Sequence, residues 1–198
     1  MAKKPAPPKR PSARERLLAA SDELFYRDGV HSTGIDAVIE KAGVAKGSLY
    51  YIFGGKDELI AAYLRGRHES WRNQVEERQR TVEDPAEKIL VMFDAIGDYA
   101  ALPDYRGDAF ANASAEAPAG SAQELATKNF REWLRGSLHD LASQTGVIDP
   151  EALVDALVVL HDGAMATAMM DNTSRGTAKT ARRIAQLTLA AAKASSSV

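Results

Sequence analysis

The sequence predicts an all-α protein of about nine helices, and three observations support this. First, apolar residues recur at the spacing of an amphipathic helix in one segment after another, as in Ile60, Leu64, Trp71 and Val75. Second, several of these segments open with a helix-capping signal. Third, we find no stretch of alternating apolar and polar residues, which a half-buried strand would need. The 198 residues are 45% hydrophobic, enough to build a helical core.

The chain begins with a segment that has nothing to bury. Residues 1–11, MAKKPAPPKRP, are rich in proline and cations, so we predict a disordered basic arm. Either this arm adds contacts to phosphate or it only keeps the protein in solution. Ser12 and Glu15 then form a capping box, which opens a helix that runs to about Arg27 and ends at Gly29.

The stretch 34–59, GIDAVIEKAGVAKGSLYYIFGGKDEL, predicts two short helices and the start of a third. Thr33, with Asp36 three residues later, is an N-cap signal for the first of them. Gly43 separates the two because it is free to take a positive φ. The second helix spans residues 46–53. Two helices crossed over a short turn that contains Gly describe a helix-turn-helix, whose second helix enters the DNA major groove.

The outer face of that second helix carries no acidic residue. Its members are small, hydroxylic, aromatic or cationic: Lys46, Gly47, Ser48, Tyr50, Tyr51 and Ile52. Phosphate repels carboxylates, so this composition favours a DNA-facing surface over an ordinary solvated helix. Lys56 begins the next helix, where its ammonium group and the free backbone N–H groups can share one phosphate.

This region resembles the DNA-binding module of the TetR (tetracycline-repressor-type) family of one-component transcriptional regulators. The resemblance covers roughly residues 13–64, about a quarter of the chain. The matching residues are Phe25, Gly29, Thr33, Ile35, Gly43, Val44, Lys46, Gly47, Ser48, Leu49, Tyr50, Phe53, Lys56 and Leu59. The chain departs from the family at Ala45, where Ser or Thr usually caps the recognition helix, and at Ile52, which is often aromatic or His.

The resemblance implies a homodimeric repressor that binds operator DNA and is released by a small, mostly apolar ligand. Each subunit would have a DNA-binding head, residues 12–55, and a ligand-binding and dimerisation body, residues 56–198. It also implies that the Thr33 hydroxyl can face a phosphate, although capping alone would explain this residue. The candidate DNA contacts are Thr33, Lys46, Gly47, Ser48, Tyr50, Tyr51 and Lys56.

Charge is distributed unevenly along the chain. The formal net charge is only −2, which by itself argues against a nucleic-acid partner. Residues 1–72, however, carry 13 Lys and Arg against 9 Asp and Glu, a net +4, while the remaining 126 residues carry −6. A basic head on an acidic body is the asymmetry expected of a DNA-binding region joined to a region that does not bind DNA.

The first two body helices have clear starts. One long helix runs from Lys56 to about Arg80, and Asp84 with Pro85 opens the next, which Pro103 stops. Residues 105–116 predict a short helix of small residues.

On that short helix, Asp108, Asn112 and Glu116 share one face. The segment resembles the body of one TetR branch, in which a Gly-Cys…Asn…Glu pattern opens the sixth helix. Asp108 stands at the Cys position of that pattern.

Three helices complete the body. A capping box at Ser121 opens the first, and Asp149 before Pro150 opens the second. A turn over residues 172–176 precedes the last helix, which runs to about Lys193 with Ile184, Leu187 and Ala191 predicted to face inside.

We predict a dimer through the last two helices, roughly residues 151–170 and 177–193. Small side chains permit close packing there, and a symmetric pair of such helices makes a four-helix interface. These small residues are Ala156, Gly163, Ala164, Ala168, Ala181 and Ala185.

Methionine and aromatic side chains in the body suit an adaptable apolar pocket. The candidate ligand-pocket residues are Met92, Phe93, Ile96, Tyr99, Phe110, Asn112, Trp133, His161 and Met165. Plain core packing is the alternative for each apolar member, and a hydrogen-bonded core histidine is the alternative for His161.

Two other functional classes were weighed. The dipeptides His139-Asp140 and His161-Asp162 are the kind that helical metal-dependent phosphohydrolases use, but only His31 and His68 remain as further histidines. We therefore expect no catalytic residues, no metal site and no cofactor. A helical interaction module without DNA is the third class, and the acid-free face of residues 46–52 argues against it.

Localisation follows from what the chain lacks. It has no cysteine, which excludes disulfides and thiolate metal sites. No window approaches 18 consecutive apolar residues, and no apolar run follows the basic N-terminus. We expect a cytoplasmic protein with no membrane partner.

Overall fold

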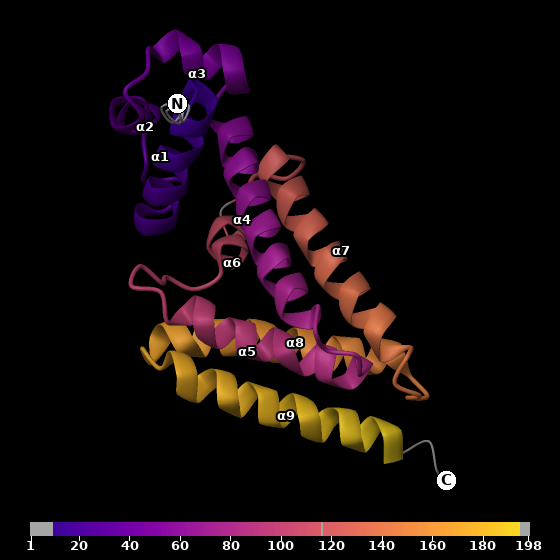
Figure 1. The fold of residues 1–198 in the computed structure, drawn as a ribbon. Helices are drawn as coiled ribbons and strands as arrows, with labels where there is room; N and C mark the ends of the chain where they lie inside the picture. Colours follow the sequence, from indigo (N-terminus) through magenta and orange to yellow (C-terminus); the bar gives the residue numbers. More distant parts are fainter. Residues whose placement is uncertain (1–9, 116, 195–198) are drawn as a thin grey trace, which may run out of the picture. The chain divides into compact units, whose positions relative to one another are not determined.

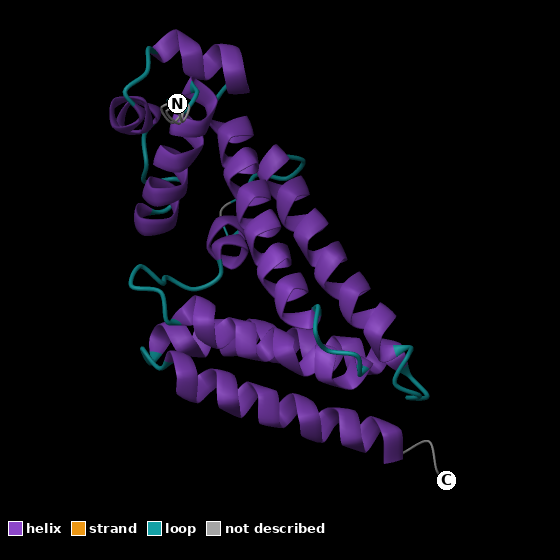
Figure 2. Ribbon diagram, viewed as in Figure 1, coloured by secondary structure: helices purple, strands orange, loops and turns teal. Residues whose placement is uncertain are grey.

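The computed structural model describes residues 10–115 and 117–194. All regular structure in these residues is helical, in nine helices and without a strand, which confirms the all-α prediction (Figure 2). The chain divides into two units, Met1–Tyr63 and Leu64–Val198, and Figure 1 shows the elements of each. The predicted basic arm, residues 1–11, lies outside the described residues except for Arg10 and Pro11.

The first unit packs three helices and the start of a fourth. They are α1 (Ala13–Asp28), α2 (Ile35–Ala42), α3 (Lys46–Phe53) and α4 (Lys56–Gln79). Leu17, Val38 and Leu49 are fully buried where α1 meets α2 and α3. The rings of Phe25 and Tyr63 meet edge to face at 5.7 Å, so the first two turns of α4 belong to this core.

Local hydrogen bonds explain the ends of α1 and α2. The Ser12 Oγ accepts from the Glu15 N–H, and the Glu15 carboxylate accepts from the Ser12 N–H at 2.7 Å, which confirms the capping box. Gly43 takes a left-handed φ of 60° and donates its N–H to the last carbonyls of α2. A residue with a Cβ is strained in that conformation, so Gly43 allows the tight turn into α3.

The predicted capping role of Thr33 is wrong. The N-cap of α2 is Gly34, and no side chain caps this helix. The buried Thr33 hydroxyl instead donates to the Gly29 carbonyl at 2.8 Å and to the Leu24 carbonyl at 3.3 Å. Thr33 therefore ties the end of α1 to the following loop.

The second unit is built from the rest of α4 and five more helices. They are α5 (Pro85–Ala100), α6 (Ala109–Ser114), α7 (Ala122–Ala142), α8 (Pro150–Met170) and α9 (Ser174–Ala194). Helices α5, α8 and α9 lie side by side, and α7 packs on α8 and α5 (Figure 1). Phe93, Leu134 and Leu157 fill the middle of this core.

The predicted start signals of the body are confirmed. Asp84 accepts from the Ala86 N–H and Asp149 from the Ala152 N–H, at 3.2 and 2.9 Å. Ser121 accepts from the Glu124 N–H at 3.1 Å, although the Glu124 carboxylate reaches the Gly120 N–H rather than that of Ser121.

The short helix α6 begins later than predicted. Its N-cap is Asp108, whose carboxylate accepts from the Phe110 N–H at 2.8 Å. A right-handed helix cannot extend back through Gly107, because this residue has a φ of 82°. A Cβ added there would also lie 2.7 Å from Met169 Sδ. Asp108 therefore precedes the helix and does not share the predicted helical face with Asn112. The third predicted member of that face, Glu116, lies outside the described residues.

The orientation predicted for the last helix is also wrong. Helix α9 starts at Ser174, inside the predicted turn, and its buried residues are three alanines, Ala178, Ala181 and Ala185, together with Leu189. Ile184 and Leu187, predicted to face inside, are 44% and 62% exposed, and Ala191 is exposed as well.

Helix α8 is long and apolar enough to meet the criteria for a membrane span, which the sequence analysis did not predict for any segment. Among the described residues it is the one helix whose length and hydropathy, 21 residues with a mean of 1.4 over its most apolar window, would permit a membrane span. Only part of its apolar surface is used within the body: Leu153, Leu157 and Met165 are buried, while Val159, Met169 and Met170 are exposed. The helix packs against α7 and α9.

Candidate nucleic-acid interface and ligand cavity

Helix α3 places its residues on two distinct faces. Leu49 is fully buried against the rest of the head, while Tyr51, two residues further, is 92% exposed. Tyr50 and Lys46 are exposed, and Ser48 is half-buried. The exposed face is therefore the aromatic and cationic one, and it carries no carboxylate of its own.

The start of α3 has an open backbone. Ala45 is the N-cap and provides no side-chain hydrogen bond, so the first N–H groups of α3 are not capped by this residue. A Cβ added at Gly47 would meet nothing within 4 Å, which leaves room for another molecule to approach the helix closely. Free N–H groups at a helix N-terminus are suited to a phosphate.

Lys46 is held by an acidic residue of the neighbouring helix. Its Nζ lies 2.9 Å from Asp36 Oδ1, and both side chains are mostly exposed. The hydrogen bond to Asp36 raises the pKa of Lys46 above its ordinary value. Exposed ion pairs of this kind are weak, so a phosphate can compete for the ammonium group.

Lys56 and Thr33 are oriented by the loop before α2. Lys56 Nζ donates to the His31 carbonyl at 3.3 Å, which holds the ammonium group near the N-terminus of α4. The Thr33 hydroxyl is committed to the carbonyls of Leu24 and Gly29, so we leave Thr33 out of the proposed DNA contacts.

Arg16 is a supporting residue that the sequence reading missed. Its Nη1 donates to the carbonyls of Ala42 and Gly43, at 3.0 and 2.8 Å, and so fixes the turn between α2 and α3 from the side of α1. Nothing in the spacing of Arg16 predicts this role, because the contact joins residues far apart in the chain.

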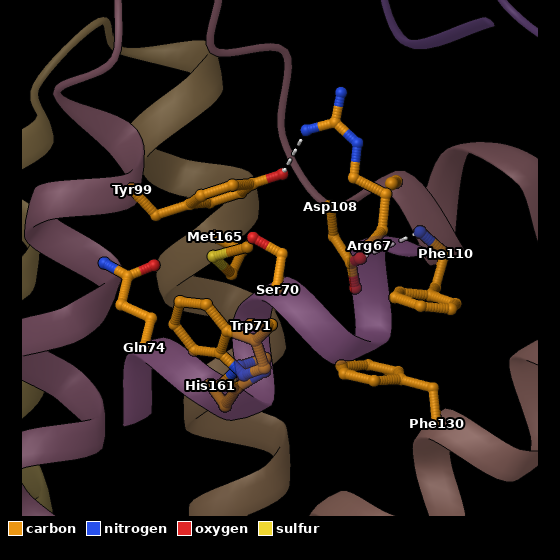
Figure 3. A pocket seen from close by; sticks show the side chains of 11 residues that line it. Arg67, Ser70, Trp71, Gln74, Tyr99, Asp108, Phe110, Phe130, His161 and Met165 are labelled. Atoms are coloured by element: carbon orange, nitrogen blue, oxygen red, sulfur yellow. Dashed lines mark hydrogen bonds between the residues drawn. The ribbon is translucent and has the colours of Figure 1, made fainter. Parts of the chain in front are cut away.

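The body encloses a small cavity with a volume of about 40 Å³. Helices α4, α5, α6, α7 and α8 all contribute to its wall (Figure 3). The lining residues are Arg67, Ser70, Trp71, Gln74, Tyr99, Asp108, Ala109, Phe110, Phe130, His161 and Met165. This volume holds only a few waters, so a drug-sized ligand needs the wall to move.

The nine predicted pocket residues fall into three groups: four line the cavity, three are buried in the core, and two lie elsewhere. Tyr99, Phe110, His161 and Met165 line the cavity. Met92, Phe93 and Ile96 are fully buried in the core of α5 and are not among the lining residues.

The other two predicted pocket residues lie off the inner cavity. Trp133 packs on His68 and Phe130, with ring centroids 5.1 and 6.1 Å apart. Asn112 is exposed, its amide donates to the Arg106 carbonyl, and it lines an outer groove.

Several lining residues were not predicted. Arg67, Ser70, Trp71 and Gln74 lie on one face of α4, at the spacing of successive helical turns. A signal for these residues was present in the sequence. Arg67 and Gln74 lie along the apolar stripe of Ile60, Leu64, Trp71 and Val75, and polar residues in such a stripe can indicate a cavity. Phe130 lines the cavity as well, and its ring stacks on Phe110 with centroids 4.0 Å apart.

Charged and polar groups surround the cavity in a defined network. Arg67 Nη1 donates to the Tyr99 hydroxyl at 3.3 Å. Arg131 Nη1 lies 2.7 and 2.8 Å from the two Asp162 carboxylate oxygens, and His161 Nδ1 lies 3.2 Å from one of them. Burial raises the pKa of Asp108 above its ordinary value.

The His-Asp pairs were also tested as metal ligands. Within residues 10–115 and 117–194, no group of three or more His, Asp or Glu side chains is placed to hold a metal ion. The acidic partner of His161 is its neighbour Asp162, and that of His139 is Glu151 at 3.3 Å.

Comparison with known proteins finds proteins that are similar to this chain. The family model described as "Bacterial regulatory proteins, tetR family" matches residues 17–63. The HTH-type transcriptional regulator LmrA of Bacillus subtilis is 28% identical over 151 residues, which cover 74% of this chain and 80% of LmrA.

Two solved structures resemble the whole chain. A TetR-family transcriptional regulator from Streptomyces coelicolor is 33% identical, with a TM-score of 0.84, and the match covers 91% of this chain and 96% of the other. A putative TetR-type regulator from Streptomyces avermitilis is 30% identical, with a TM-score of 0.76 and coverage of 89% and 99%.

Proposed function

The chain belongs to the TetR family of transcriptional regulators, and from this premise we propose that it is a repressor that binds operator DNA as a homodimer and is released by a small, mostly apolar ligand. We propose that it works in the cytoplasm and has no catalytic activity. Its relatives are transcriptional regulators, and the proposal extends that role to this chain.

The exposed face of α3 is the observation that carries the proposal. A helix-turn-helix reads DNA with its second helix, and α3 presents Lys46, Gly47, Ser48, Tyr50 and Tyr51 without any carboxylate. An aromatic ring as exposed as Tyr51 has no role in the packing of the head. Its phenol and ring are suited to contacts with sugar, phosphate or base edges.

Dimerisation is supported by apolar side chains that the body leaves uncovered. The exposed side chains are Val159 on α8 and Ile184 and Leu187 on α9. Val159 and Ile184 line a groove between these two helices, together with Gly163 and Ala181. Exposed apolar side chains grouped on one surface are characteristic of interaction sites. A symmetric partner would cover this surface with its own copy of the same two helices.

Ligand binding is supported by the cavity in the body. Its wall combines the rings of Trp71, Tyr99, Phe110 and Phe130 with a few polar groups, which is the composition of a small-molecule site. Because α4 continues from the head into this wall, a ligand that shifts α4 acts on the helix that begins at Lys56.

A gel-shift titration with the DNA upstream of the protein's own gene tests the DNA-binding part. We expect Tyr50→Ala to weaken specific binding. Lys56→Ala should weaken binding to all sequences and lower the salt slope by about 1, since one phosphate contact is lost. Lys128→Ala is the control, because this lysine is exposed on α7 in the body and pairs only weakly, with Glu132. Unchanged affinity in both head variants would refute the assignment.

A further inference from the structure

Two buried ring nitrogens on the cavity wall have no hydrogen-bond partner. They are Trp71 Nε1 on α4 and His161 Nε2 on α8. The two residues are only 7% and 2% exposed, and their rings meet edge to face with centroids 5.9 Å apart. Figure 3 shows them together, between the Phe110–Phe130 pair and Tyr99. Buried polar atoms normally have a partner, so this pair marks the place where a ligand's polar group would bind.

The surroundings of His161 decide what each nitrogen can do. Its Nδ1 faces the Asp162 carboxylate, which Arg131 also holds. An ionised carboxylate only accepts hydrogen bonds, so Nδ1 carries the hydrogen and, in the neutral ring, Nε2 presents a lone pair. The indole Nε1 of Trp71 is only a donor. The cavity therefore offers one donor and one acceptor on adjoining rings.

A hydroxyl group matches this pair, because it accepts one hydrogen bond and donates another. A ketone or ether would satisfy Trp71 alone, and a carboxylate would face the His161 lone pair with Asp108 and Asp162 nearby. The wall also carries aromatic and sulfur-containing side chains, Tyr99, Phe110, Phe130 and Met165, beside the polar Arg67, Ser70, Gln74 and Asp108. Such a wall packs well on a flat ring.

We propose that the ligand is a hydroxyaryl compound whose hydroxyl accepts from Trp71 Nε1–H and donates to His161 Nε2. This inference rests on the proposed function, since it names the chemical class of the inducer that the body would bind. It adds a role for Trp71, which the sequence presented only as part of an apolar stripe.

The ligand's size requires Phe110 to move. Asp108 and Phe110 line both the inner cavity and an outer groove of about 400 Å³, which Thr127, Arg131 and Met169 also line. Phe110 therefore stands between the two spaces. With its ring displaced, the two spaces become one site of the size typical of small-molecule pockets, about 300–1,000 Å³. The hydroxyl end occupies the inner part and the rest of the ligand extends into the groove.

Calorimetric titration of the full-length protein with three probes tests this inference: 2-naphthol, 2-methoxynaphthalene and naphthalene. The measurement is made at pH 8, below the ordinary pKa of a phenol, about 10, so that the hydroxyl of the probe keeps its proton. We expect 2-naphthol to bind about tenfold more tightly than the ether and more tightly still than naphthalene.

Three variants separate the hydrogen bonds from packing. Trp71→Phe and His161→Leu should each weaken 2-naphthol about tenfold and leave naphthalene unchanged. Trp133→Phe is the matched control, because this second tryptophan packs on His68 and Phe130 and does not line the cavity. It should leave the affinities for all three probes unchanged. Thermal melts of each variant confirm that it folds.

Equal affinity for the three probes, or no binding of 2-naphthol up to its solubility limit, overturns the inference even if a variant fails to fold. Operator release then distinguishes the two proposals. If 2-naphthol binds with the expected pattern and operator affinity is unchanged, the hydroxyaryl site stands and the induction mechanism fails. If another apolar compound releases the operator while 2-naphthol does not bind, repression stands and the hydroxyaryl site fails.

Discussion

Asp108 and Asp162, two carboxyl groups beside the body cavity, respond to the fold in opposite directions. Burial raises the pKa of Asp108, and the hydrogen bond from the Phe110 N–H offsets only part of this effect. Burial also acts to raise the pKa of Asp162, but hydrogen bonds from His161 and Arg131 outweigh it and the pKa falls below its ordinary value. The two groups therefore make opposite contributions to the pH dependence of stability.

Asp108→Asn should stabilise the protein at neutral pH. A raised folded-state pKa favours folding below the ordinary value of 3.8, and this contribution is lost as pH rises through the folded-state value. Asn removes the charge and remains a good N-cap for α6. Urea unfolding at pH 8 should show a more stable variant, and the difference should vanish toward pH 4. A variant that is less stable than the wild type at pH 8 contradicts this expectation.

Asp162→Asn should have the opposite effect. The lowered folded-state pKa contributes stability above pH 3.8, and this contribution is lost as pH falls through the folded-state value. The variant should be less stable than the wild type at pH 7 and should approach it in acid. Asp155→Asn is the control, because its pair with Arg135 is exposed and such pairs contribute little. Equal losses in the two variants would argue against a special role for Asp162.

At the scale of elements, the contact between α5 and α9 depends on a missing side chain. A Cβ at Gly97 would lie 2.8 Å from the Cβ of Ala178, well inside van der Waals contact. The two helices can therefore approach this closely only because Gly faces Ala at the crossing. The same close approach explains why α9 turns Ala178, Ala181 and Ala185 inward and Ile184 and Leu187 outward.

Gly97→Ala should push the two helices apart and destabilise the protein by about 1–3 kcal/mol, the usual effect of overpacking. Gly136→Ala is the control, because a Cβ there meets nothing within 4 Å. Since Gly is a poor helix former, the control should gain up to about 1 kcal/mol. Urea unfolding measures both changes, and a stabilised Gly97→Ala variant would show that α5 and α9 can separate freely.

The outward face of α9 leads to a prediction about assembly. Replacing both Ile184 and Leu187 by Glu places charges on the surface that we propose a second copy covers. Sedimentation at micromolar concentration should then show a monomer, with helical content retained because both positions are exposed. Lys179→Glu changes the charge of an exposed residue on the same helix and should leave the dimer intact. A wild-type monomer under these conditions would falsify the proposed assembly.

At the scale of the whole molecule, local sequence signals, such as helix caps and apolar periodicity, predicted most of the fold. Caps such as Ser12, Asp84 and Asp149 act within one helical turn, so they can be recognised from the sequence. The start of α6, which was predicted too early, also has such a local signal in the Asp108 cap. The orientation of α9 has none, because it depends on Ala178 lying against Gly97 of α5, which is far away in the chain.

The candidate cavity was predictable only in part, for the same reason. Tyr99, Phe110, His161 and Met165 could be chosen by residue type. Met92 and Phe93 do not line the cavity, because other helices cover the face of α5 on which they lie. Which face is covered cannot be predicted from the sequence. The rule that large apolar residues face inward failed on much of α9, where Ala178, Ala181 and Ala185 are buried and Ile184 and Leu187 are exposed, although Leu189 does face inward.

The last prediction concerns the coupling between ligand and DNA. A dimer that reads two major-groove half-sites must hold its recognition helices about 34–36 Å apart, or at a helical-turn multiple of that distance. Arg67, Ser70, Trp71 and Gln74 of α4 line the cavity, and the same helix begins at Lys56 in the head. Consider a ligand that binds more tightly when α4 is not in its DNA-binding arrangement. It lowers operator affinity by the difference between its own binding free energies for the two arrangements of α4, typically about 1–3 kcal/mol.

Linkage then requires operator DNA to weaken ligand binding by the same factor. Titrating the ligand into the free protein and into the protein–operator complex measures one side, and titrating operator with and without saturating ligand measures the other. The two ratios should agree within error. Tight binding in the body that leaves operator affinity unchanged would exclude that compound as the inducer, while the DNA-binding role of α3 would stand, because it depends on the head alone.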